Sequence, residues 1–270
     1  MSETDTIDPA QEPLTVKSLV RQLEACGLSP GQTVLVHTSL SRLGWVAGGS
    51  QAVIEALLTV LGPAGTLMMP AHSNGNSEPS YWKNPPVPVH WWQVIRDELS
   101  PFDPQRTPTR GIGRVAELFR TWPGVVRSNH PAESLAAHGA NAEQLVGGHR
   151  LDDEYGEDSP IGRLYALDGF VLLLGAGHDS NTSLHLAERR ATWPTKHTIT
   201  QGSAVLIDGA RQWVTYLALA IDSGDFPLIG SDYEMQDGIR PGRVGKAEVR
   251  FLRQRPLVDF AVGWIERNRK

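Results

Sequence analysis

The stretch "TVLVHTSLSRLGWVAGGSQAVIEALLTVLGPAGTLMMP", residues 33–70, decides the fold class. It opens with a short apolar run, typical of a buried strand, that ends at His37. After a loop, Ser50 can cap a helix over residues 51–62, and the turn "GPAG" leads to a second strand, "TLMMP". A strand, a helix and a strand in this order form a βαβ unit, which predicts a parallel sheet.

Apolar patterns on both sides extend this unit. Residues 16–26 have helical spacing, and "FVLLLGAG", residues 170–177, is continuously apolar, as in a strand covered on both faces. Two later apolar runs are joined by Asp208-Gly209, which predicts a C-terminal hairpin, and residues 257–270 form a closing amphipathic helix. The sequence therefore predicts one α/β domain over residues 14–270, with a mixed, largely parallel central sheet flanked by helices.

The segment from residue 72 to residue 108 interrupts these patterns. It contains Trp82, Trp91 and Trp92 and seven prolines between Pro79 and Pro108. We expect an ordered, aromatic-rich insertion with a short helix near residues 91–99. Because indole rings stack on sugar faces, Trp82 is a candidate for the wall of a substrate site; alternatively, the tryptophans only pack a long loop.

Composition narrows the class of protein. The 270 residues carry a net charge of −5 without a basic stripe, so we expect no nucleic-acid partner. The single cysteine, Cys26, excludes a disulfide framework within this chain, and no apolar run approaches the roughly 18 residues of a membrane span. The first 13 residues are acidic and polar, unlike a signal peptide, and are predicted to be a flexible tail. These features predict a cytoplasmic protein without a membrane partner.

Candidate catalytic residues follow the strand at residues 170–174. In open parallel sheets, ligands bind beyond the carboxyl ends of the strands, and this strand delivers His178 and Asp179 to that edge. His185 and Glu188 then lie one turn apart on the next helix. A histidine beside a carboxylate can act as a general base, with the carboxylate setting its tautomer. Alternatively, His185 packs locally and Glu188 belongs to a solvated face.

Two other interpretations of this stretch are weaker. His178 and His185 could be two zinc ligands, but a metal needs three or four, and neither a His-Glu-x-x-His motif nor a cysteine pair is present. We therefore expect no metal. The sequence "GAGHDS" lacks the third glycine of a dinucleotide fingerprint, so we expect no nicotinamide site.

The loop after the first strand is rich in hydroxyl groups. It contains His37, Thr38, Ser39 and Ser41 before a glycine pair, and hydroxyls with free backbone N–H groups can hold phosphate. The alternative is a serine-rich turn with a core histidine. Ser39 could also be a hydrolase nucleophile, but Gly-x-Ser-x-Gly is absent. In "VVRSNHPAES", Arg127 is either a phosphate partner or a structural arginine.

Several blocks occur together in an order that resembles the aminoglycoside 3-N-acetyltransferase family. They are "VLVHTSLSRLGWVAGGSQAVIEALL", "GTLMMP", "TPTRGIGRVAELFRTWPGVVRSNHP", "DSPIGRLYALDGFVLLLGAGHDSNTSLHLAE" and "VGKAEVRFLRQRPLVDF". The resemblance runs from about residue 14 to the C-terminus. It implies acetyl transfer from acetyl-CoA to the 3-amino group of a 2-deoxystreptamine aminoglycoside. It also implies a mixed α/β sandwich peculiar to this family rather than the usual acetyltransferase fold.

The resemblance also assigns roles to residues. The family's catalytic histidine falls on His185, with Glu188 beside it. The implied CoA contacts are His37, Thr38, Ser39, Ser41, Arg127, Ser128 and Asn129. The implied partners are an aminoglycoside and acetyl-CoA, with no metal, in a monomer or a homodimer.

The chemistry adds further expectations. A protonated amine cannot attack a thioester, so His185 must remove a proton. Thr38, Ser39 and nearby amides are expected to stabilise the charge on the thioester oxygen, with the CoA pyrophosphate along residues 41–49.

The sequence departs from the family in one segment. In "YLALAIDSGDF", residues 216–226, the family tends to place acidic residues, whereas this chain has Ala218 and Ala220. The remaining candidates for substrate binding are Asp179, Asp222, Asp225 and Trp82. Fewer carboxylates imply weaker binding of a polycation or a different amine. An acyltransferase of another amine, or a non-catalytic protein that binds CoA or the drug, therefore stays open.

Overall fold

The main sheet has seven strands in the order β3-β4-β2-β1-β5-β9-β8. The structure is a computed structural model and describes residues 4–10 and 12–270. The strands of this sheet are β1 (Thr33–Thr38), β2 (Thr66–Pro70), β3 (Val126–Arg127), β4 (Leu135–Gly139), β5 (Phe170–Leu174), β8 (Gly242–Val244) and β9 (Ala247–Arg253).

Strand direction confirms a mixed, largely parallel sheet. β1 lies at the centre and pairs in parallel with both β2 and β5. β4 is antiparallel to β2 and to β3, and β9 is antiparallel to β5 and to β8. Only β4 and β9 therefore run against the other five strands. The three parallel central strands bring their carboxyl ends to one edge of the sheet.

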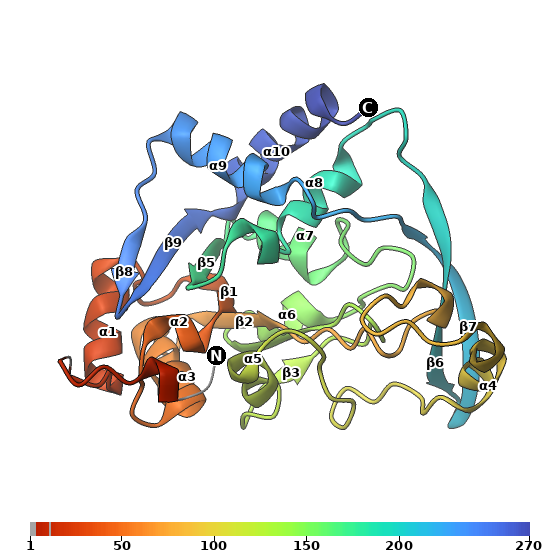
Figure 1. Cartoon of the computed structure of the whole chain (residues 1–270), viewed down its shortest axis with the longest axis horizontal. Coiled ribbons are helices and arrows are strands. Elements are labelled where there is room, and N and C mark those ends of the chain that lie inside the picture. Colours follow the sequence, from red (N-terminus) through yellow and green to blue (C-terminus); the bar gives the residue numbers. More distant parts are fainter. Residues whose placement is uncertain (1–3, 11) are drawn as a thin grey trace.

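Helices cover both faces of the sheet (Figure 1). Val34 and Val36 of β1 belong to a core shared with helices α1, α3 and α5, whereas Leu35 belongs to a second core shared with α6 to α10. This alternation is expected of a strand buried on both faces. The helices are α1 (Val16–Ala25), α2 (Leu40–Leu43), α3 (Gly49–Leu61), α4 (Trp92–Glu98), α5 (Arg114–Phe119), α6 (Ala142–Val146), α7 (Pro160–Ala166), α8 (Leu184–Arg190), α9 (Phe226–Asp237) and α10 (Gln254–Asn268).

The predicted hairpin and insertion form a separate part of the molecule. β6 (Thr198–Ile207) and β7 (Ala210–Leu219) pair only with each other, joined by Asp208-Gly209 as predicted. Figure 1 shows α4 of the insertion beside these strands. The buried Asn76 side chain donates to Ala204 O (3.0 Å) and accepts from Ala204 N (2.9 Å), so the insertion is bound to the hairpin much as a neighbouring strand would be.

The described part of the predicted N-terminal tail packs against the domain. It contains a 3-10 turn at Thr4–Thr6, and Thr6 is buried. Asp8 lies 3.0 Å from the Lys246 ammonium group. The domain boundary at residue 13 and the flexibility of the residues before it stay predictions. No helix in the described ranges is long and apolar enough to cross a membrane.

Candidate active site

A cavity of about 1080 Å³ opens at the carboxyl edge of the three parallel strands. His37 of β1 lines it, together with His72, which follows β2, and Gly175, which follows β5. Thr38, Ser39 and Ser41, predicted from the hydroxyl-rich loop, also line it. The topology of the sheet therefore places this loop beside a space large enough for a small-molecule ligand.

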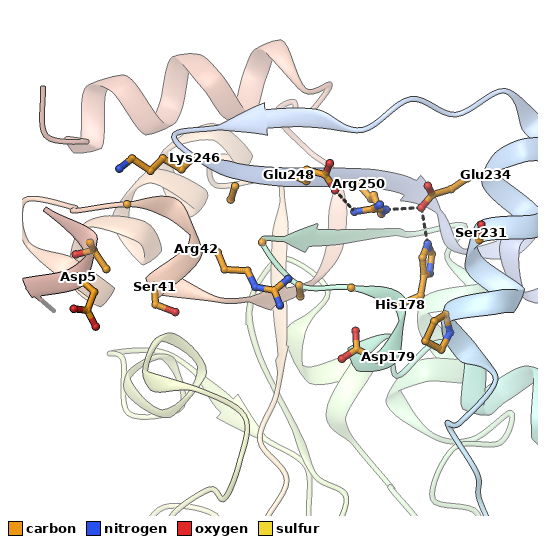
Figure 2. A pocket seen from close by; sticks show the side chains of 17 residues that line it. Asp5, Ser41, Arg42, His178, Asp179, Ser231, Glu234, Lys246, Glu248 and Arg250 are labelled. Atoms are coloured by element: carbon orange, nitrogen blue, oxygen red, sulfur yellow. Dashed lines mark hydrogen bonds and ion pairs between the residues drawn. The ribbon is translucent and has the colours of Figure 1, made fainter. Parts of the chain in front are cut away.

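A second cavity of about 690 Å³ adjoins the first and shares Ser41, Arg42 and Asp179 with it. Figure 2 shows His178, Glu234 and Arg250 linked in its wall. His178 Nε2 lies 2.8 Å from Glu234 Oε1, and Arg250 Nε lies 2.5 Å from the same oxygen. Burial lowers the pKa of His178 even though Glu234 opposes the shift. The protein therefore holds this imidazole in place.

The structure brings together His185 and Glu188, the predicted base and its partner. His185 Nδ1 lies 2.5 Å from Glu188 Oε2. The imidazole stacks on Tyr155 with 4.6 Å between ring centroids and lies 4.8 Å from the Phe226 ring. Helix α8 begins at Leu184, just after Ser183, whose backbone N–H donates to Asn181 Oδ1 (3.2 Å). These contacts leave the ring few alternative orientations.

Glu188 is fully buried, which excludes the alternative of a solvated helix face. Its Oε1 atom accepts from Arg269 Nη1 (2.5 Å) and from Asp222 N (2.9 Å). Because Glu188 Oε2 engages Nδ1 of His185, the carboxylate places the proton of a neutral imidazole on Nδ1. Within residues 4–10 and 12–270, no hydrogen bond reaches His185 Nε2, so that nitrogen is free to accept a proton.

Two further imidazoles connect this pair to the larger cavity. Burial, followed by the charges of His72 and His185, lowers the pKa of His37 to about 3. Burial also lowers the pKa of His72, whose Nδ1 atom is 3.4 Å from Glu133. His185 does not line either cavity, but the Tyr155 ring on which it stacks lies with its centroid 6.2 Å from that of His72, which lines the larger cavity. The candidate base therefore lies beside the cavity edge.

Sequence reasoning missed an acidic group around Tyr155. The Tyr155 hydroxyl donates to Glu133 Oε2 (2.6 Å). Burial, together with Glu133, Glu154 and Glu188, raises the pKa of Tyr155 well above its usual value. Glu154 is buried; its Oε1 accepts from Leu219 N (3.0 Å), while Oε2 has no partner among the described atoms. Burial raises the pKa of Glu154.

Sequence features could have predicted some of these residues but not others. Glu133, Glu154 and Tyr155 stand in segments without a helical or strand pattern, so spacing could not bring them together. His72 follows the second strand just as Ser39 follows the first, and the rule about parallel strand ends could have found it. Arg269 lies 81 residues from Glu188 and carried no local signal.

The predicted phosphate role of Arg127 does not fit the structure. All five of its N–H bonds are used inside the protein, toward Pro104 O, Thr107 O, Ala71 O, Ser73 Oγ and Ser134 Oγ. Ser128 Oγ bonds His149 Nδ1 at 2.9 Å, and Asn129 is exposed outside the cavity lining. The Arg127 side chain therefore has a structural role, whereas contacts of Ser128 and Asn129 with CoA stay predictions.

Two predicted substrate contacts, Asp225 and Trp82, have partners within the protein. Both oxygens of Asp225 accept from Arg269, at 2.6 and 2.7 Å, so its charge is already neutralised. Trp82 donates to Ser77 Oγ (2.9 Å) and lines neither cavity, in agreement with the alternative of loop packing. Asp222 is exposed and Asp179 lines both cavities, so these two stay predictions.

Fold and site together define a class of protein. A buried carboxylate orients an imidazole beside a polar cavity at the edge of an α/β sheet, an arrangement that an enzyme acting on a small molecule can use for acid–base chemistry. Within the described ranges, no group of three or more His, Cys, Asp or Glu side chains is placed to hold a metal ion.

Comparison with known proteins identifies the family. The family model for aminoglycoside 3-N-acetyltransferase matches residues 35–266. An aminoglycoside N(3′)-acetyltransferase-like protein, YokD of Bacillus subtilis, is 42% identical over 257 residues, covering 95% of this chain and 94% of that protein. Aminoglycoside N(3)-acetyltransferase VIII of Streptomyces fradiae is 39% identical, covering 98% and 96%. The chain belongs to the aminoglycoside 3-N-acetyltransferase family and is an N-acetyltransferase.

Solved structures agree with this assignment. The crystal structure of YokD from Bacillus subtilis is 41% identical and has a TM-score of 0.94, covering 98% of each chain. AAC-IIIb in a binary complex with CoASH has 33% identity and a TM-score of 0.85, covering 95% of this chain and 97% of that one. AAC-VIa bound to sisomicin has 32% identity and a TM-score of 0.85, covering 95% and 98%. The fold is therefore the one that the resemblance implied.

The buried His37 generates a prediction about acid stability. Its pKa is about 3 in the folded state, against an ordinary value of 6.5. Below pH 6.5 the unfolded chain therefore binds a proton that the folded chain does not, and stability falls as the pH falls. His37→Leu should remove this contribution, so that between pH 7 and pH 5 the variant loses about 2 kcal/mol less unfolding free energy than the parent. Urea unfolding at the two pH values measures the difference; equal losses would contradict the prediction.

Proposed function

We propose that the protein transfers the acetyl group of acetyl-CoA directly to the 3-amino group of a 2-deoxystreptamine aminoglycoside, with His185 as general base. The observation that carries the proposal is the bond from Glu188 to Nδ1 of His185, which leaves Nε2 as the proton acceptor. The reaction takes place where acetyl-CoA is available, and we propose the cytoplasm as its compartment.

In this mechanism the amine nitrogen forms a bond to the thioester carbon while its proton passes to Nε2 of His185. The imidazolium that results is stabilised by the buried carboxylate of Glu188. Backbone N–H groups and hydroxyls of Thr38 and Ser39 stabilise the charge on the thioester oxygen. The carbon–sulfur bond then breaks, and CoA leaves as the thiol after taking up a proton.

Support for the donor comes from the larger cavity. It is lined by Thr38, Ser39 and Ser41 and by His72, whose ring lies 6.2 Å from that of Tyr155, the ring on which His185 stacks. A related protein of the same fold, AAC-IIIb, has been solved with CoASH. In the proposal, His37, Thr38, Ser39 and Ser41 contact the donor, whose thioester lies toward His185.

Support for the acceptor comes from the carboxylates around Tyr155. An aminoglycoside is a polycation, and Glu154 has one buried carboxylate oxygen without a partner within the described ranges. Its other oxygen accepts from the backbone N–H of Leu219, the residue between Ala218 and Ala220. We propose that Glu154 receives an ammonium group of the acceptor and supplies the negative charge that this segment lacks. Asp179 and Asp222 remain further candidates.

A second function is favoured by the same two alanines. With Asp225 neutralised by Arg269, the segment after the hairpin offers fewer free carboxylates than a polycation would use. The same chemistry could therefore act on an amine that is not an aminoglycoside. A non-catalytic protein that binds CoA or the drug without acetylation is the remaining alternative.

The proposal predicts thiol release from acetyl-CoA in the presence of gentamicin, tobramycin, kanamycin or apramycin, with product acetylated at the 3-amino group. A thiol-reactive dye measures the rate, and mass spectrometry with NMR locates the acetyl group. Release with another amine but with none of the antibiotics would favour the second function. Binding of CoA and aminoglycoside without any product would favour the non-catalytic alternative.

The general-base role predicts the effect of His185→Ala. Since a positioned base contributes about 100- to 10,000-fold, kcat should fall by at least about 100-fold while the dissociation constant of CoA stays unchanged. Steady-state kinetics and calorimetric CoA titration separate the two effects. The exposed His90→Ala serves as the matched control. Undiminished turnover in the His185 variant would remove His185 from the mechanism.

The acceptor role predicts that Glu154→Gln raises the KM of the aminoglycoside without changing that of acetyl-CoA. Loss of one charge-assisted hydrogen bond should raise it about 10-fold or more. Glu157→Gln is the control, because Glu157 is a neighbouring exposed glutamate paired with Arg190. If both KM values are unchanged in Glu154→Gln, the carboxylate does not face the acceptor.

A further inference from the structure

Arg269 joins three segments of the chain behind the candidate base. Its Nη1 atom donates to Glu188 Oε1 (2.5 Å) on helix α8, and its Nη2 atom donates to Asp222 O (2.7 Å) in the segment before α9. Nε and Nη2 also donate to the two carboxylate oxygens of Asp225, at 2.7 and 2.6 Å. Helix α10, which ends at Asn268, packs against α8 (Figure 1) and so brings the guanidinium group to Glu188.

The surroundings of Arg269 hold its guanidinium group in place. Only 12% of the side chain is exposed, and its Cζ atom lies 5.1 Å from the centroid of the Trp193 ring. The backbone N–H of Arg269 donates to Ile265 O (2.9 Å) in the last turn of α10. Ion pairs at an exposed surface contribute little, because water and salt screen them. Here the partner, Glu188, has no exposed surface, so the positive charge acts on it strongly.

The charges around the base determine how readily it takes up a proton. In the reaction proposed above, the pair formed by Glu188 and His185 accepts one proton from the amine. Beforehand, Glu188 and Asp225 are negative and Arg269 is positive, which leaves one negative charge in excess. Without Arg269 the excess would be two negative charges, and without Asp225 it would be zero. Because negative surroundings favour proton uptake, loss of Arg269 and loss of Asp225 should act in opposite directions.

The other titratable groups around the imidazole do not obscure this effect. Burial lowers the pKa of both His37 and His72 and raises that of the Tyr155 hydroxyl, so these three groups stay uncharged near neutral pH. The remaining charged or titratable side chains around the pair are Glu133, Glu154, Lys196 and Asp222. None of them changes in the variants compared below, so a difference between variants reports the charge of Arg269 or Asp225.

We infer that Arg269 is a positioning residue of the catalytic pair: by holding the carboxylate of Glu188, it limits how readily His185 takes up a proton before the substrates arrive. The inference rests on the proposed function, in which an imidazole that is already protonated cannot serve as the base. Burial lowers the pKa of Arg269, but the bonds to Asp225 and Glu188 outweigh burial and raise it, so the guanidinium group keeps its charge. Arg269 does not line either cavity and therefore acts through Glu188.

NMR titration of the His185 ring tests the inference without requiring acetyl transfer. With isotope-labelled histidine, the signal that is absent from His185→Ala identifies the ring. In Arg269→Met the ring should take up its proton at a pH about one unit or more above that of the parent, the size of shift that one neighbouring charge produces. Arg269→Lys keeps the charge, and its midpoint should stay close to that of the parent. Arg267→Met, which replaces an exposed arginine of α10, is the matched control. A midpoint in Arg269→Met at or below that of the parent would overturn the inference.

Asp225→Asn provides a second titration, with the opposite expected direction. Asparagine has nearly the same shape as aspartate and removes one negative charge, so the His185 ring should take up its proton at a lower pH than in the parent. This variant decides the question if Arg269→Met does not fold, which circular dichroism establishes. An unchanged or raised midpoint in Asp225→Asn contradicts the inference in either case.

Kinetics separate this inference from the proposed function. In Arg269→Met, the low-pH limb of the kcat/KM profile for thiol release should move to higher pH by the same amount as the ring titration, and turnover should recover at alkaline pH. A merely structural role would instead lower turnover at every pH without moving the limb, and this result would reject the inference. If the ring titrations shift as expected but the parent releases no thiol with any amine, the effect of Arg269 on the pair is retained and the proposed function is wrong.

Discussion

A single buried carboxylate, that of Glu188, holds the candidate active site together. It binds His185, Arg269 and the backbone N–H of Asp222, and so ties helix α8 to the C-terminal residues and to the segment after the hairpin. Burial of a carboxylate is costly unless donors surround it, and removing one partner of such a pair typically costs about 3–5 kcal/mol. The orientation of the imidazole therefore depends on the folding of three segments that are distant in sequence, and this dependence makes the site rigid.

Arg269 balances the negative charges of the buried network around Glu188. Burial by itself would lower the pKa of its guanidinium group, but hydrogen bonds to Asp225 and Glu188 outweigh burial and raise that pKa. One arginine thus neutralises two carboxylates that would otherwise repel each other beside the imidazole. Asp225 is consequently a structural partner, even though its sequence position resembles that of a substrate ligand.

Sequence patterns over a few neighbouring residues predicted those parts of the structure that are formed by residues close together in the chain. The apolar run of residues 33–37, the Asp208-Gly209 turn and the three-residue spacing of His185 and Glu188 predicted the central strand, the hairpin and the contact between these two side chains. The features that the sequence did not predict depend on contacts between residues far apart in the chain. The donors of Arg127 are all used by carbonyl and hydroxyl oxygens of other segments. Similarly, no sequence spacing indicates that Glu154 accepts a hydrogen bond from Leu219, 65 residues away. An exposed arginine and a structural one look identical in sequence, because the difference lies in the acceptors that the fold brings to them.

The charges on the two sides of the cavity edge have opposite signs, and this arrangement matters for a reaction between an anion and a polycation. Arg42, Arg110 and Arg114 line the cavity, whereas Glu133 and Glu154 lie around Tyr155, which stacks on the imidazole of His185. A CoA thioester and an aminoglycoside attract each other in solution through groups that take no part in the chemistry. In the proposed reaction, contacts with the protein replace those attractions, and the one amine that is to react can approach the thioester next to His185. In this proposal, deprotonation of the amine needs only the unpaired Nε2 atom, since the carboxylate on the other side of the ring compensates the charge that forms.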